Sequence, residues 1–384
     1  MNLFQNIKFD RNEFSGAFGD IGTDLPLIIG IILTTRIDAA SALIMFGLMQ
    51  IFTGMRYGIP LSVQPLKAFA AIIITQKISG NIMFAGGLMI GIIMLVLSLT
   101  GIIKRLAEWT PKCVIRGIQF GLGIKLSVLA LKNYIGAEAI PGYAIAAIAF
   151  IVGVFLLGNR KYPPAVFIIA LGMLSAIIFK KFDLSFISAA SIEFPKSQLT
   201  FSLGDFISAF FLLTLPQIPL SIGNSILATS RIAKDYFPEK DVSVKKISYT
   251  YSLMNIVSPF FGGIPSCHGS GGIAGHYAFG ARTAGSVIIY GSLFLMIGLF
   301  FSHNFQNVMN LFPLPILGVM LLFESITLLS LIKDTTSQTF EFFIAVAVGL
   351  AAANLPYGFA VSLPLGLMLY YSRHLMPKLI KNIE

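Results

Sequence analysis

Charged residues are scarce in this chain of 384 residues. Asp, Glu, Lys and Arg make up only 11% of it, whereas hydrophobic residues make up 56%. Soluble domains carry about 25% charged residues, so a water-soluble fold of this length is excluded. The mean hydropathy of +0.83 agrees. We therefore expect an integral membrane protein.

Other signals are missing as well. The two cysteines, Cys113 and Cys267, lie in or beside apolar segments and provide no disulfide framework. No His-Glu-x-x-His or Cys-x-x-Cys motif is present, so we expect no metal site and no cofactor. No Asp-rich cluster is available for Mg²⁺, which excludes a membrane enzyme of the prenyltransferase type. The first residues, MNLFQNIKFDRNEF, have no apolar core, so we expect no removable signal peptide.

Long apolar runs dominate what remains. Runs of spanning length occur at 14–34, 39–55, 81–103, 111–130, 142–158, 163–179, 203–229, 247–261, 284–301, 305–330, 338–355 and 357–372. Two further pieces, 61–74 and 270–281, are too short to cross a ~30 Å hydrocarbon core as continuous helices. Together they predict an all-α membrane protein with about fourteen elements, two of them half-helices.

The basic residues indicate the topology. If the N-terminus is cytoplasmic, the cytoplasmic loops hold roughly three times as many Lys and Arg as the opposite side, as the positive-inside rule requires. We therefore expect both termini in the cytoplasm and the chain in the cell membrane. The net charge of +10 then reflects topology, and nucleic-acid binding is not needed to explain it.

Two motifs recur in the same order. GIPLSVQPLKAFAAI from Gly58 aligns with GIPSCHGSGGIAGHY from Gly263, and DLPLIIG from Asp24 matches QIPLSIG from Gln217. This duplication predicts two repeats, about 14–180 and 203–375. Because each repeat holds seven elements, an odd number, the copies must be inverted in the membrane. Short segments interrupted by Pro and Gly at matching positions indicate a transporter binding site.

The interrupted segments favour an anion. We expect a half-helix to begin just after Pro65 and another just after Pro265, with their N-termini facing each other near the midplane. The free N–H groups at such an end carry about +0.5 charge and bind anions. Gly269, Gly271 and Gly272 would let a ligand approach the backbone closely.

Several side chains near the breaks are candidate ligands. Lys67 in the first turn after Pro65 lies at membrane depth, where ionisable residues are usually functional. Arg116 is near the end of its span and is interpreted as reaching the interface, and Lys125 is left unassigned. The polar residues expected in the binding site, together with the glycines above, are Thr23, Gln64, Gln217, Asn224, His268 and Ser270. The neutral ones could instead bond neighbouring helices.

Carboxylates near the breaks are candidates for ion coupling. Asp20 and Asp24 either cap the helix that follows Gly19, pair with Lys67 or carry protons. Glu324 within an apolar span presents the same choice. His268 is read as a neutral donor or a proton carrier.

Four motifs carry a resemblance to a known family. They are FGDIGTDLPL (18–27), VQPLKAFAA (63–71), LPQIPLSIGNSILA (215–228) and GGIPSCHGSGGIAGHYAFGARTAG (262–285). Together they closely resemble the molybdate transporters, distant relatives of the SulP sulfate permeases. The resemblance implies a seven-plus-seven inverted-repeat fold with core and gate subdomains. The positions that match the family motifs are Asp20, Gly22, Thr23, Pro26, Gln64, Pro65, Lys67, Gln217, Asn224, His268, Gly269, Gly271, Gly272 and Arg282.

The predicted function is secondary active transport of molybdate, with tungstate or sulfate as further substrates. We expect the transport to be proton symport. Proton coupling is expected because a dianion entering against a negative-inside potential needs accompanying cations. A sulfate transporter and a nucleobase symporter of the same fold are the alternatives; an anion channel is a third. The chain ends twelve residues after its last expected span, so we expect no STAS domain of the kind typical of SulP permeases. A homodimer would then have to pair through membrane spans. Asp24 occupies a position expected to be apolar in the family.

Overall fold

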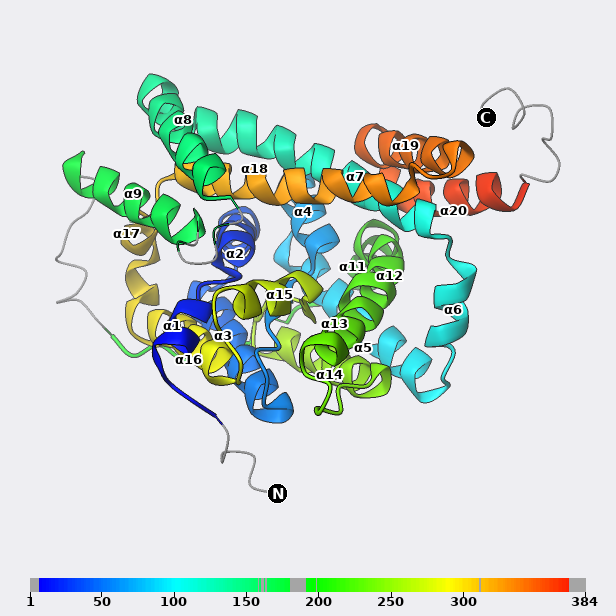
Figure 1. Ribbon diagram of the computed structural model, residues 1–384, viewed down its shortest axis with the longest axis horizontal. Coiled ribbons are helices and arrows are strands. Elements are labelled where there is room, and N and C mark those ends of the chain that lie inside the picture. Colours follow the sequence, from blue (N-terminus) through cyan, green and yellow to red (C-terminus); the bar gives the residue numbers. More distant parts are fainter. Residues whose placement is uncertain are drawn as a thin grey trace.

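The computed structural model describes residues 7–157, 159, 162, 164–179, 191–197, 199–310 and 312–372. Most of this part of the chain is helical (Figure 1). The longer helices are α2 (Ile21–Thr35), α3 (Ala39–Tyr57), α5 (Gly80–Leu99), α7 (Lys112–Leu129), α8 (Ala139–Leu156), α9 (Pro164–Ile178), α14 (Val244–Phe260), α16 (Gly285–Met296), α18 (Leu314–Ser330), α19 (Thr339–Asn354) and α20 (Gly358–Tyr371).

Shorter segments join or extend these helices. The short α-helices are α1 (Arg11–Gly16), α4 (Lys67–Gln76), α6 (Ile103–Trp109), α11 (Leu203–Ala209), α12 (Leu215–Leu220), α13 (Thr229–Tyr236), α15 (Ser270–Ala278) and α17 (Phe305–Asn310). Turns of π- or 3₁₀-helix are η1 (Ala130–Tyr134), η2 (Ile135–Glu138), η3 (Phe210–Thr214), η4 (Ser221–Ala228), η5 (Ile297–Phe301), η6 (Ser302–Asn304) and η7 (Leu331–Thr335). From α11 to α13 these pieces form one helical segment, Leu203–Tyr236.

The apolar runs predicted the helices well, with two differences. The run at 305–330 divides before Pro313, which is the N-cap of α18, because proline favours a helix start and disfavours the helical conformation in the residue before it. The run at 14–34 divides between α1 and α2. Among the described residues, five helical segments are long and apolar enough to cross a membrane, and six shorter helices are also apolar. The expected ends of the two repeats, 180 and 375, lie outside the described residues.

The two interrupted segments meet. The strands β1 (Val63–Pro65) and β2 (Ser266–His268) pair antiparallel, with Gln64 opposite Cys267. The half-helices α4 and α15 follow these strands. One detail differs from the expectation. Helix α4 begins two residues after Pro65, but α15 begins only at Ser270, because β2 separates Pro265 from it.

The helices form two groups by their contacts. The first group contains α3 packed on α16 and α5 packed on α14, with α4 against α2. The second group contains α7 packed on α18 and α19, α19 on α20, and α8 on α9 and α18. Figure 1 shows α7, α8, α18, α19 and α20 along one side, with α3, α14 and α16 on the other and α15 near the centre. The groups meet mainly where α18 crosses α2 and α7 contacts α4.

Small residues bring the paired helices close. A Cβ on Gly47 of α3 would lie 2.5 Å from the Gly291 carbonyl oxygen of α16. A Cβ on Gly117 of α7 would lie 2.7 Å from the Ala345 carbonyl oxygen of α19. Both distances are far below van der Waals contact, so only glycine permits this backbone approach, a packing mode common between membrane helices.

The N-terminal helix α1 is fastened to the second repeat through Glu13. This buried carboxylate accepts hydrogen bonds from the backbone N–H groups of Arg282 (2.8 Å), Thr283 (2.7 Å) and Ser286 (2.9 Å), where α16 begins. Negative charge at a helix N-terminus is stabilising. Glu13 therefore joins the start of the chain to the segment that follows α15.

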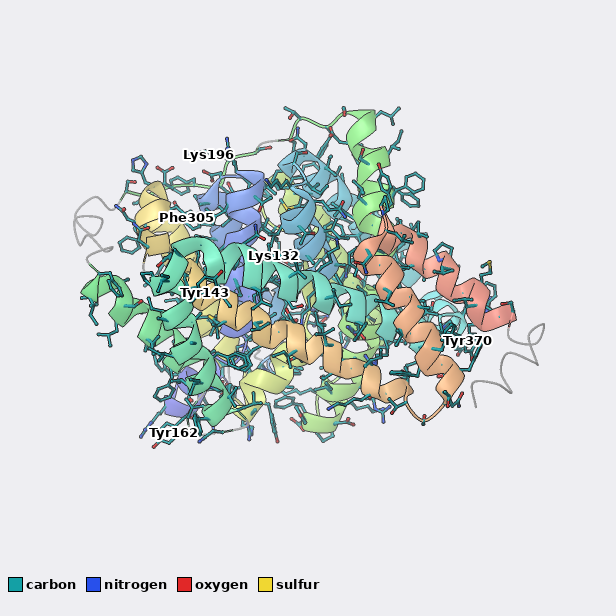
Figure 2. The ribbon with its side chains drawn as sticks, turned by 90° about the horizontal axis from the view of Figure 1, so that it is seen from above. Lys132, Tyr143, Tyr162, Lys196, Phe305 and Tyr370 are labelled. Atoms are coloured by element: carbon teal, nitrogen blue, oxygen red, sulfur yellow. The ribbon has the colours of Figure 1, made fainter. Side chains whose placement is uncertain are left out.

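The outer surface is strongly apolar. On α8 the exposed side chains include Ile140, Tyr143, Ile148 and Phe155, the first and last more than 80% exposed. Figure 2 shows Tyr143 and Tyr162 at one end of the molecule and Tyr370 at the other. Apolar surface of this extent suits a lipid environment, and aromatic residues are enriched at its interfaces.

Candidate functional site

A pocket lies where the two half-helices approach the second helix group. The space in it that the centre of a water-sized molecule can occupy is about 50 Å³. Its lining comes from β1–α4, β2–α15, α12–η4, α7 and α18. The lining residues are Gln64, Lys67, Gln119, Leu122, Gln217, Leu220, Asn224, Ser225, Cys267, His268, Gly269, Ser270, Gly271 and Leu328. Eight of the ten residues expected in the binding site therefore line one pocket, and Thr23 and Gly272 do not.

The N-terminal ends of the half-helices are open. Leu66, the N-cap of α4, has an apolar side chain, and Gly269, the N-cap of α15, has none. Neither residue therefore caps the first turn of its helix through a side-chain hydrogen bond. Among the described residues, none accepts a hydrogen bond from the N–H of Ser270 or Gly271. Free N–H groups at a helix start are suited to an anion.

The three glycines of this turn differ in their surroundings. A Cβ on Gly271 would meet nothing within 4 Å. A Cβ on Gly272 would overlap Ser62 Oγ and Asp20 Oδ2, and one on Gly269 would overlap the Gln64 side chain. Gly269 and Gly272 therefore permit the two repeats to pack together, whereas Gly271 alone leaves open space above the backbone.

Lys67 forms an ion pair across the two helix groups. Its Nζ donates to Glu324 Oε1 of α18 at 2.5 Å, and Thr23 Oγ1 of α2 donates to Glu324 Oε2 at 3.0 Å. The Lys67 side chain is 25% exposed and that of Glu324 9%. Thr23 thus contacts the partner of Lys67 rather than lining the pocket itself.

Asp20 is held by the first interrupted segment. Its carboxylate accepts from Gln64 Nε2 at 2.6 Å and from Ser62 Oγ at 3.0 Å. It occupies the N-cap position of α2 but makes no side-chain cap bond, so the capping interpretation of Asp20 is wrong. Through Gln64, the carboxylate is one hydrogen bond from the pocket.

The remaining coupling candidates are buried elsewhere. Asp24 Oδ2 accepts from Tyr290 Oη at 3.1 Å, and its Oδ1 has no partner among the described residues. The His268 ring is fully buried, with Nε2 2.6 Å from Thr250 Oγ1 and the ring edge-on to Tyr57. Within the described residues, no three His, Cys, Asp or Glu side chains are grouped to hold a metal ion.

Sequence reasoning missed Gln119 and Ser225 in the pocket. Gln119 stands in an apolar run, and no motif marks it. Its only local signal is Arg116 one turn earlier. Arg116 forms an ion pair with Asp334 of η7, at the end of α18. It donates through Nε to Asp334 Oδ2 at 3.0 Å and through Nη1 to Gln119 Oε1 at 2.8 Å.

Comparison with solved structures identifies the fold. The transmembrane domain of a cyanobacterium bicarbonate transporter, BicA, matches with a TM-score of 0.66 and 17% identity over 95% of this chain and 98% of that one. SLC26A9 matches with a TM-score of 0.69 and 12% identity over 94% of this chain and 65% of that one. The expected seven-plus-seven inverted-repeat membrane fold is confirmed, and it includes the short β1–β2 strand pair.

Comparison of sequences identifies the family. A family model described as "Molybdate transporter of MFS superfamily" matches residues 12–126 and 209–328, more than half of the chain. Molybdate transporter 2 of Arabidopsis thaliana is 31% identical over 93% of this chain and 87% of its own length. Molybdate transporter 1 of Chlamydomonas reinhardtii is 25% identical over 92% of this chain and 90% of its own. The chain belongs to this molybdate transporter family, and it is a multi-pass membrane transporter rather than an enzyme.

Proposed function

We propose that the protein carries molybdate across the cell membrane and holds it between the N-termini of α4 and α15. The observation that carries this is the open turn at Ser270–Gly271, whose free N–H groups line the same pocket as Lys67. Backbone N–H groups, a lysine and neutral amides together suit a tetrahedral dianion. Tungstate and sulfate share that charge and shape, and they are the further substrates.

Lys67 has a carboxylate partner, Glu324. An oxyanion in the pocket would compete with Glu324 for the Lys67 ammonium group, because both offer oxygen acceptors to the same donor. The two helix groups would correspond to a core, which contains both half-helices, and a gate that includes α7 and α18. Exchange of Lys67 between Glu324 and the ligand would then loosen a contact between core and gate.

Proton coupling is the second part of the proposal. Asp20 is the favoured carrier, because its carboxylate is bonded to Gln64, which lines the pocket. A change in the charge of Asp20 would therefore alter the field at the anion site. His268, the other candidate, has its ring turned to Thr250 and Tyr57. Both termini would be cytoplasmic, as the distribution of basic residues requires.

A nucleobase symporter of this fold is less well supported. The second-repeat span presents Gln217 and Asn224 to the pocket, where a carboxylate would be needed to accept from the ring N–H groups of a base. The free donors of the pocket favour an acceptor-rich ligand instead.

The test is binding and uptake by the purified protein. Calorimetric titration with molybdate, tungstate, sulfate and uracil should give binding of the oxyanions and none of uracil. Proteoliposomes with an inward proton gradient should accumulate molybdate, and a protonophore should abolish the accumulation. Failure to bind any of the three oxyanions would exclude the proposed function, and binding with uptake insensitive to the protonophore would exclude only the proton coupling.

A further inference from the structure

Gln119 is the polar residue that the second helix group contributes to the pocket. It lies on α7, its side chain is fully buried, and it lines the pocket opposite the half-helices. The other polar lining residues, which include Lys67, Gln217, Asn224 and the β2–α15 turn, lie on segments outside that group. Gln119 therefore faces the same space from the other side of the boundary between the groups.

The orientation of the Gln119 amide is fixed by its neighbour. Arg116 Nη1 lies 2.8 Å from Gln119 Oε1, and a guanidinium can only donate. The amide oxygen must therefore face Arg116. Arg116 itself is held by Asp334 through Nε and Nη2. As a result, the amide NH₂ is the free end, and among the described residues Nε2 is a buried donor without a partner.

Gln217 gives an informative contrast. Its Nε2 donates to Ser221 Oγ at 3.1 Å, and its Oε1 is buried without a partner. Ser221 Oγ also bonds Tyr251 Oη, and a hydroxyl can donate or accept, so Gln217 can present either end of its amide to the pocket. Arg116 leaves Gln119 no such choice. A buried donor that cannot turn away needs an acceptor, and a ligand in the pocket that Gln119 lines would supply one.

We propose that Gln119 is a binding residue for the transported oxyanion, donating from Nε2 to one of its oxygens, and that Arg116 is the residue that positions it. This rests on the proposed oxyanion site and extends it across the boundary between the helix groups. The ligand would then be held by α4 and α15 on one side and by α7 on the other. Gln119 can contribute only in the arrangement of the groups that places α7 beside the pocket.

Two substitutions separate a binding role from a structural one. Gln119→Glu keeps an oxygen for Arg116 and replaces the free NH₂ by a second carboxylate oxygen, which repels an anion. Gln119→Met removes both the amide oxygen and the NH₂ group and keeps a side chain of similar size. Ser127→Ala on the same helix is the control, because among the described residues Ser127 Oγ bonds only the Ile124 carbonyl of its own helix, and Ser127 does not line the pocket.

The measurements are the molybdate dissociation constant by calorimetry and the melting temperature without ligand. A hydrogen bond to a charged group corresponds to about a ten- to hundredfold effect on affinity. We expect Gln119→Glu to weaken molybdate binding by at least that much with an unchanged melting temperature, and Gln119→Met to weaken it about tenfold. Ser127→Ala should match wild type in both.

Equal molybdate binding by Gln119→Glu and wild type would contradict the binding role of Gln119. If Gln119 only supported Arg116, Gln119→Glu would strengthen that pairing and bind molybdate within twofold of wild type, and Gln119 would be removed from the site. If Gln119→Met fails to fold, the Gln119→Glu result decides alone. If the wild-type protein binds no molybdate, tungstate or sulfate, the oxyanion site as a whole is excluded. That result differs from one in which the wild type binds molybdate and Gln119→Glu binds it equally well, which excludes only the role of Gln119.

Discussion

Lys67 at the start of α4 is ion-paired with Glu324 in the middle of α18, and this pair joins the two helix groups beside the pocket. Lysine in mid-membrane needs a partner, because its charge costs about 2.5–3.5 kcal/mol on insertion scales. The sequence suggested a bound anion or a carboxylate such as Asp20 for that role. The partner is the carboxylate of Glu324, whereas Asp20 accepts hydrogen bonds from Ser62 and Gln64.

This pairing sets the expectation for Lys67→Gln. The change leaves a buried carboxylate with Thr23 as its remaining partner, so the ligand-free protein should lose about 1–3 kcal/mol of stability, less than a fully buried pair because Lys67 is partly exposed. It should also lose most of its molybdate affinity. Melting temperatures with and without molybdate measure both effects.

Glu324→Gln should have the opposite effect on binding. Without a competing carboxylate, Lys67 is free for the anion, and molybdate should bind more tightly than to wild type. The double variant Lys67→Gln/Glu324→Gln removes both charges and should recover most of the stability lost in Lys67→Gln while still binding molybdate poorly. Equal molybdate affinity in Glu324→Gln and wild type would show that the two anions do not compete.

Gly271 and Gly272 should separate binding from folding. Gly271→Val places its side chain in open space, so the protein should fold normally but lose molybdate binding, since the branched Cβ covers the free N–H groups. Gly272→Val must displace Ser62 and Asp20, so its melting temperature should fall. Normal molybdate binding by a folded Gly271→Val protein would place the anion elsewhere.

Asp20→Asn tests the proton coupling. The substitution keeps the size of the side chain and removes its titration, so molybdate should still bind. Accumulation driven by a pH gradient in proteoliposomes should be lost, while exchange of internal for external molybdate continues. Uptake by Asp20→Asn that still follows the pH gradient would assign the proton to another group.

Glu13→Gln tests the fastening of the N-terminal helix. Glu13 accepts three backbone hydrogen bonds near the start of α16, and weakening these charge-assisted bonds should cost about 1–3 kcal/mol. The molybdate dissociation constant should not change, because Glu13 is outside the pocket. Glu239→Gln, at an exposed position, is the control and should leave the melting temperature unaltered.

The sequence was most informative where the signal was local. The length of the apolar runs predicted the spans, and Pro and Gly at matching positions predicted the half-helices around Lys67 and Gly271. Gln64 and Gln217 were recognised because they lie within the repeated motifs.

The side-chain pairs could not be predicted from the sequence, because they depend on how distant helices cross. Nothing in the sequence shows that α18 places Glu324 beside Lys67 or that Asp20 accepts a hydrogen bond from Ser62 instead. Gln119 is a lone glutamine in an apolar run, and its role follows only from the fixed orientation that Arg116 and Asp334 impose. The second half-helix started later than predicted because β2 lies between Pro265 and Ser270.

The antiparallel pairing of β1 with β2 also bears on biogenesis. Val63 is opposite His268, so the ribosome makes the first strand long before its partner exists. Unpaired strand backbone is costly within a bilayer. The insertion machinery, a chaperone or water must therefore shield Val63–Pro65 until the second repeat arrives, and assembly of the transport site becomes a late step of maturation. Truncations that end before β2 should consequently be recognised by membrane quality control, even where every earlier span has inserted.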